Sequence, residues 1–286
     1  MTLQKTRPMP TVAISTSESP DMAVLGLSDG HLQDAMAEIA LHLLASGTSL
    51  AYGGDLRVHG FTELLFELIV RYRDHPHHSG KITVTDYLAW PVHIRMTADD
   101  LAAFATGHEA SAHLIFLARD GSRLEWEQRL ELPVHEPDDD EWAEGLTTMR
   151  VVMREETQAR IVLGGRVDRY KGRMPGIAEE TLLSLQSHQP VFLLGGFGGC
   201  TRDIAETIGL VDPWAGSRSN WDGRSCFEGY SPGDLHNGLS DEDNMVLART
   251  PHIQQAVTLV SRGLRRILNE QNNMESQGGT DAQGIH

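Results

Sequence analysis

The 286-residue sequence predicts one α/β domain with a mostly parallel sheet and helices on both faces. Three observations lead to this fold class. Short apolar segments alternate with amphipathic ones along the chain, as strands and helices do in βαβ units. Several apolar segments end in paired glycines, which is typical of a strand that turns directly into a helix. Hydrophobic residues make up 40% of the chain and charged residues 22%, a balance typical of a globular protein.

The elements follow in an order that matches a Rossmann-like fold. Apolar runs predict strands at residues 11–16, 48–54, 81–90, 112–118, 159–166 and 190–194. Helical periodicity predicts helices at residues 32–47, 61–73, 97–107, 141–158, 175–188, 200–209, 241–249 and 251–269. Pro91 is expected to end the third strand, and the acidic stretch within 132–145 reads as a solvated loop. Residues 214–238, rich in Gly, Ser, Asn and Trp, give no assignment.

Domain limits and location follow from composition. We expect an N-terminal arm at 1–10, one domain at 11–268 and a disordered polar tail at 269–286. The formal net charge of -16 disfavours binding to nucleic acid or to an anionic membrane. No apolar run approaches the ~20 residues that span a bilayer. The N-terminus has no apolar signal core and the chain has only two cysteines, so we expect a cytoplasmic protein.

Glycine loops are the first candidate binding elements. They comprise Gly53 and Gly54, Gly164 and Gly165, and the run Gly195, Gly196, Phe197, Gly198 and Gly199. In an open parallel sheet such loops gather at the carboxyl edge, where main-chain amides can face an anion. The alternative is that each pair only makes a tight turn. No Walker loop is present, and no Gly-x-Gly-x-x-Gly follows the first strand.

Polar and charged residues beside these loops are the second group of candidates. An arginine fork suits phosphate oxygens, so a local basic lining would favour a phosphorylated ligand. Asp55 is a candidate acceptor for ribose hydroxyls, or a partner of Arg57. Ser15 and Ser17 either contact phosphate or cap the next turn. The basic candidates are Arg57, Arg150, Arg166, Lys171 and Arg173, each of which is otherwise an ordinary surface charge.

Metal and thiol chemistry are not expected. His75, His77 and His78 lie in one predicted loop, but no second cluster has zinc-like spacing, so we predict no metal site. Cys200 has no adjacent histidine that could activate it and is interpreted as structural. No cofactor is predicted.

The stretches "AYGGDLRVHGFTELL" and "GRMPGIAEE" resemble the two glycine elements of the Lonely Guy (LOG) phosphoribohydrolases, members of the SLOG superfamily of Rossmann-like nucleotide-binding proteins. Together with "LLGGFGG", they resemble most the SLOG branch associated with TIR and nucleoside phosphorylase-like domains in bacterial conflict systems. The resemblance covers roughly residues 10 to 210.

The resemblance implies roles for individual residues. Gly53, Gly54 and Gly60 fall on the first element, and Gly164, Gly165, Gly176 and Glu180 fall on the second, which an insertion at 166–175 interrupts. "TTMRVVM" places Arg150 on the family's Met-x-x-Arg element. Asp55 replaces a family glycine and Ile177 replaces the threonine expected to contact phosphate, which puts hydrolysis in doubt.

If the protein is an enzyme, Glu180 and Arg150 would be its catalytic residues, since a carboxylate can stabilise positive charge that develops on a ribose. Glu179 is a second acidic candidate for the binding site. The alternative for both carboxylates is that they only stabilise their helix by interacting with its dipole, a contribution of ~0.3 to 1 kcal/mol each.

Three functions are compatible with these observations. The leading hypothesis is a sensor that binds a nucleotide-derived small molecule, such as an NAD-like or ADP-ribose-like signal or a nucleoside phosphate. The first alternative is a nucleotide N-glycosidic hydrolase, and the second is a non-catalytic assembly module. The expected partners are the small molecule, further copies of the chain in a dimer or larger oligomer, and a separately encoded effector. Nucleic acid and membranes are not expected as partners.

Overall fold

A computed structural model describes residues 10–54, 61–73, 84–108, 113–214 and 220–278. It confirms a single α/β domain built on a seven-stranded sheet of order β5-β4-β3-β2-β1-β6-β7. All neighbouring strands are parallel except β4 and β5. The strands are β1 (Thr11–Ser17), β2 (Ser49–Gly53), β3 (Val84–Leu88), β4 (His113–Leu117), β5 (Arg123–Leu124), β6 (Ala159–Gly164) and β7 (Val191–Leu194).

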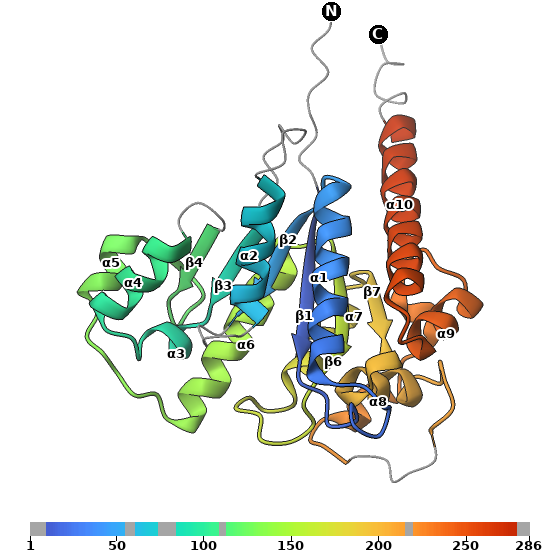
Figure 1. The fold of residues 1–286 in the computed structure, drawn as a ribbon, viewed down its shortest axis with the longest axis horizontal. Helices are drawn as coiled ribbons and strands as arrows, with labels where there is room; N and C mark the ends of the chain where they lie inside the picture. The colour runs from blue at the N-terminus through green and yellow to red at the C-terminus, as the bar shows by residue number, and fades with distance from the viewer. Residues whose placement is uncertain (1–9, 55–60, 74–83, 109–112, 215–219, 279–286) are drawn as a thin grey trace, which may run out of the picture.

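Helices cover both faces of the sheet (Figure 1). The helices are α1 (Asp29–Ala45), α2 (Phe61–Arg73), α3 (Trp90–His93), α4 (Ala98–His108), α5 (Trp126–Glu131), α6 (Asp139–Glu156), α7 (Gly176–Gln186), α8 (Gly199–Thr207), α9 (Asp241–Arg249) and α10 (Ile253–Gly278). Short 3-10 turns are η1 (Gly195–Phe197), η2 (Arg224–Phe227) and η3 (Pro232–Leu235). None of the helices in the described ranges is long and apolar enough to cross a membrane.

Alternation along the central strands divides the core between the two faces. Val12 and Ile14 of β1 pack with α1, α2 and α10, whereas Ala13 points to the other face, where α6 lies. On β6, Val162 packs against α7 and α8. Because both faces are covered, β6 and the interior of β1 are buried, and their apolar residues, such as Val12, Ile14 and Val162, face helices on both sides of the sheet.

The structure corrects several expected boundaries. Pro91 does not simply end a strand: β3 ends at Leu88, and Pro91 lies in the first turn of α3, where its missing N–H costs nothing. The acidic run is not a loop throughout, because Asp138 caps α6 by accepting from the Glu141 amide at 2.8 Å and the following acidic residues form the first turn. Strand β5 and helix α5 were not predicted. Helix α10 continues past residue 269, the predicted end of the last helix, to Gly278.

Candidate functional site

The candidate site lies where β1 and β6 run side by side. Ser17 at the end of β1 pairs with Gly164 at the end of β6. From these ends the chain leads to α1 on one face and to α7 on the opposite face, so this is the topological switch point of the sheet. Figure 1 shows the segments that follow β1 and β6 together at the lower edge of the sheet. Ligands of open α/β sheets bind at this position.

A buried pair of charges joins α6 to α7 beside this edge. Arg150 of α6 donates from Nη1 to Glu179 Oε2, and the Thr147 hydroxyl donates to the other oxygen of Glu179 at 2.5 Å. Arg150 and Glu179 are both buried. The backbone approaches the arginine closely, because a Cβ added to Gly176 would lie 2.8 Å from Arg150 Nη2. A larger residue at position 176 would therefore displace the guanidinium of Arg150 from its present position.

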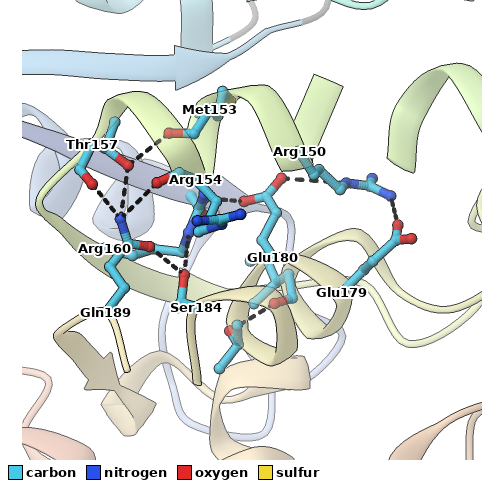
Figure 2. Close-up of polar contacts among 12 residues, drawn as sticks. Arg150, Met153, Arg154, Thr157, Arg160, Glu179, Glu180, Ser184 and Gln189 are labelled. Carbon is cyan, nitrogen blue, oxygen red and sulfur yellow. Dashed lines mark hydrogen bonds and ion pairs between the residues drawn. The ribbon is translucent and has the colours of Figure 1, made fainter. Parts of the chain in front are cut away.

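A second buried pair lies one residue further along α7. Arg160 of β6 donates from Nη1 to Glu180 Oε2 at 2.9 Å and to Ser15 Oγ at 2.7 Å, and its Nε donates to Ser184 Oγ at 3.0 Å. The other oxygen of Glu180 lies 3.5 Å from Arg150 Nε. Burial lowers the pKa of Arg160, and the charge of Glu180 opposes that shift. Figure 2 shows Glu180 between the two arginines.

The two pairs form one electrically balanced network. Two arginines face two glutamates inside the protein, so each charge taken from water has a partner. The structure thus brings together Arg150, Glu179, Glu180 and Ser15, as the sequence predicts for one site. The prediction missed Arg160, although a signal was present: an arginine inside the buried apolar strand "ARIVLGG" needs a buried counter-ion.

The first glycine pair, Gly53 and Gly54, packs against side chains from other elements of the fold. A Cβ on Gly53 would lie 2.9 Å from the Met149 side chain of α6. Gly54 donates its amide to Asp86 Oδ1 at 3.0 Å, and a Cβ there would meet Thr62 and Asp86. The neighbouring candidates Asp55, Arg57 and Gly60 lie outside the described residues, as do His75, His77 and His78.

The second glycine pair, Gly164 and Gly165, also leaves no room for a side chain. A Cβ on Gly164 would lie 2.6 Å from the carbonyl oxygen of Ser17, and one on Gly165 would lie 2.8 Å from Cys200. Both have positive φ, at 66° and 108°. Glycine at these positions therefore allows the chain that leaves β6 to pass close to the end of β1 and the start of α8.

The third glycine run meets both main chain and a carboxylate. Gly195 and Gly196, with Phe197 in the buried turn η1, pack against the chain that leaves α9, since added Cβ atoms would meet the carbonyls of Ala248 and Thr250. Gly198 lies against Asp21, and the Gly199 amide donates to Asp21 Oδ2 at 2.6 Å. An aspartate from the segment after β1 therefore caps the N-terminus of α8, where an anion would be favoured.

Exposed cations gather on the segment between β6 and α7. The Arg166 side chain pairs with Glu18 at 2.9 Å, and its amide donates to Ser17 Oγ at 3.2 Å. Lys171 Nζ lies 3.9 Å from the ring centroid of Trp142 on α6. Arg169 and Arg173 are exposed. This cationic segment, residues 166–173, lies at the switch point of an otherwise acidic protein.

Two other features, an apolar hollow and the buried thiol of Cys200, offer no site for a nucleotide. A hollow at the opposite edge of the sheet is lined mainly by apolar residues such as Val12, Ala159 and Leu264, with no charged side chain that could hold a phosphate. Burial raises the pKa of the Cys200 thiol well above its usual value, so it stays protonated in the core. In the part of the chain that the structure describes, no three His, Cys, Asp or Glu side chains are arranged to hold a metal ion.

The comparison with known protein families adds an independent finding to this geometry. The family model described as SLOG cluster2 matches residues 8–271. The chain belongs to the SLOG cluster2 family. This confirms the SLOG superfamily that the glycine elements resemble, and membership of that superfamily suggests a nucleotide-related function for this Rossmann-like protein. A search of curated proteins finds no match.

Proposed function

We propose that this SLOG protein binds a nucleotide-derived small molecule at the β1/β6 switch point and acts as a sensor. The observation that carries the proposal is the cationic segment 166–173 at that edge. Arg166, Arg169, Lys171 and Arg173 bring four cations within eight residues, in a chain whose formal net charge is -16. The segment contains one acidic residue, Asp168, so its local charge is positive and can attract an anion that the net charge of the protein repels.

The contacts of this segment suit a phosphorylated ligand. Arg173 is exposed, and among the described residues it has no ion-pair partner. Arg166 lies at the strand end in an exposed pair with Glu18, whose carboxylate oxygens lie 2.9 Å from its Nε and 2.9 Å from its Nη2. Arg173 therefore has its guanidinium donors available to phosphate oxygens, whereas a ligand that reaches Arg166 must compete with Glu18.

Sensing is favoured over hydrolysis by the state of Glu180. Both of its oxygens face arginines, and the residue is only 9% exposed. A general acid or base must reach the group whose proton it transfers. A carboxylate fixed between two guanidinium groups is poorly placed for that task, and Ile177 lacks the hydroxyl of the family's threonine.

The proposed biological setting follows from the family. We place the protein in a bacterial conflict or signalling system, near the branch associated with TIR and nucleoside phosphorylase-like domains, and in the cytoplasm. A separately encoded effector would read the bound state, and the protein would work as a homodimer or a larger oligomer. These roles rest on family resemblance.

The test is calorimetry with AMP, ADP, ADP-ribose, NAD and cyclic nucleotides. We expect one of them to bind, with Arg173→Gln weakening binding several-fold and Arg265→Gln, an exposed arginine on α10, leaving it unchanged. The absence of binding by every ligand at millimolar concentration would remove the proposal.

The same samples test the two alternatives. Release of free base from nucleoside monophosphates, abolished by Glu180→Gln, would establish the hydrolase instead. A defined oligomer without binding or turnover would favour the assembly module.

A further inference from the structure

We propose that His188 and His236 form a binding site for a divalent transition-metal ion. His188 Nδ1 and His236 Nε2 lie 3.2 Å apart, and both side chains are exposed. Two nitrogens that each lie about 2.0–2.1 Å from a tetrahedral zinc ion are about 3.3–3.4 Å apart. The spacing in the structure therefore already matches that of two ligands of one metal ion.

Both histidines come from fixed backbone positions. His188 follows α7 and His236 follows η3, and both have positive φ, at 53° and 46°. Such backbone conformations are uncommon outside glycine, although histidine, asparagine and aspartate adopt them more often than most residues. The metal site would thus bring together two segments that are far apart in the sequence.

A buried amide side chain follows each histidine and anchors it. Gln189 donates to the Thr157 carbonyl oxygen at 2.6 Å and accepts from Ser184 Oγ at 2.6 Å. Asn237 donates to the Val191 carbonyl oxygen at 2.7 Å. The backbone at both histidines is therefore held in place before any ion arrives, so binding orders little additional chain.

The two side chains offer a transition-metal ion a ligand type that it prefers. Neutral imidazole is a good ligand for zinc, copper and nickel. Two histidines supply two ligands, and water completes the coordination.

Binding requires both facing nitrogens to be without a proton. In the hydrogen-bonded pair one facing nitrogen carries the shared proton. When the metal binds, that proton moves through solvent to the outer nitrogen of the same ring. Both imidazoles stay neutral, and the facing lone pairs bind the metal.

The test is titration of the full chain with zinc chloride and with Cu²⁺, compared with His188→Asn and His236→Asn. Asparagine tolerates positive φ, so these variants should keep the backbone while removing the ligand nitrogen. His252→Asn, which removes an exposed histidine elsewhere, is the matched control. The expected result is that each of the two variants binds one ion fewer than the wild type and the control.

The paramagnetic signal of bound Cu²⁺ gives the second readout. Coupling to two imidazole nitrogens in the wild type, lost in both variants, supports the site. Metal stoichiometry that is unchanged by His188→Asn and by His236→Asn would overturn the proposal, whatever the outcome of the nucleotide titrations.

Discussion

Arg160 of β6 and Glu180 of α7 form an ion pair in the interior, with the arginine Nη1 2.9 Å from the glutamate Oε2 and the arginine side chain 0% exposed. The pair fixes α7 on the sheet directly behind the switch point. Desolvation offsets much of the attraction between two buried charges, but removing one partner leaves the other uncompensated.

Arg160→Met is therefore expected to lower the free energy of unfolding by up to about 3–5 kcal/mol, because it leaves Glu180 with only the longer contact to Arg150. The double variant Arg160→Met with Glu180→Met removes both charges and should be clearly more stable than the single variant. Urea denaturation measures both. The single variant Glu180→Met completes the comparison. If the double variant loses as much free energy of unfolding as the two single variants together, the two residues are not energetically coupled and the interpretation is wrong.

Gly54→Ala tests whether the turn after β2 is packed so closely against neighbouring side chains that it has no room for a methyl group. The new methyl group would meet the Thr62 hydroxyl and lie 2.5 Å from Asp86 Oδ1, so we expect a loss of about 1–3 kcal/mol in the free energy of unfolding. Gly229→Ala, where nothing lies within 4 Å, is the matched control and should be nearly neutral. Equal melting temperatures for the two variants would contradict this reading.

His93 should make stability depend on pH. Burial lowers the pKa of His93 to about 4, helped by Arg129 and opposed by the Leu117 carbonyl. Nδ1 accepts from Arg129 Nε at 2.8 Å, so Nε2 carries the proton and donates to the Leu117 carbonyl oxygen at 2.9 Å. The folded protein holds the ring neutral, whereas the unfolded chain takes up a proton below about pH 6.5.

The contribution of His93 is therefore complete above pH 6.5 and is lost as the pH falls towards 4. Across this window we expect a loss of about 3 kcal/mol from this residue. Denaturation of the wild type and of His93→Gln at several pH values measures it. The variant should be less stable at pH 7, but its free energy of unfolding should change less between pH 6.5 and 4. If the free energies of the two proteins change with pH in parallel, His93 is not the source of the pH dependence.

Asp21→Asn tests competition at the N-terminus of α8. The asparagine oxygen can still accept from the Gly199 amide, so the cap remains while its negative charge is removed. A phosphorylated ligand should then bind more tightly by about 0.3–1 kcal/mol, a factor of about two to five. Asp34→Asn, an exposed change of the same charge on α1, should have a much smaller effect in the same calorimetry. Equal gains in the two variants would show that only net charge matters.

Local sequence patterns were sufficient to predict most of the strands and helices of this protein. Alternating apolar runs and helical stripes predicted β1, β2, β6 and the helices that follow them, because burial of a strand or a helix face requires those periods. Gly164 and Gly165 were placed at the end of a strand for the same local reason, with ligand binding as their leading interpretation and a tight turn as the alternative. The short β5 and α5 were missed because a strand of two residues and a helix of six carry too little periodicity to be detected.

The sequence by itself determined the fold class, the strand-end glycines and the SLOG resemblance, since all three depend on residues close together in the chain. Only the tertiary structure decided what those residues touch. Asp21 reaches Gly199 across 178 positions, and Ser15 meets Arg160 across 145. Which carboxylate neutralises which buried cation depends on how the elements pack together, and that packing is fixed by the whole core rather than by any one segment.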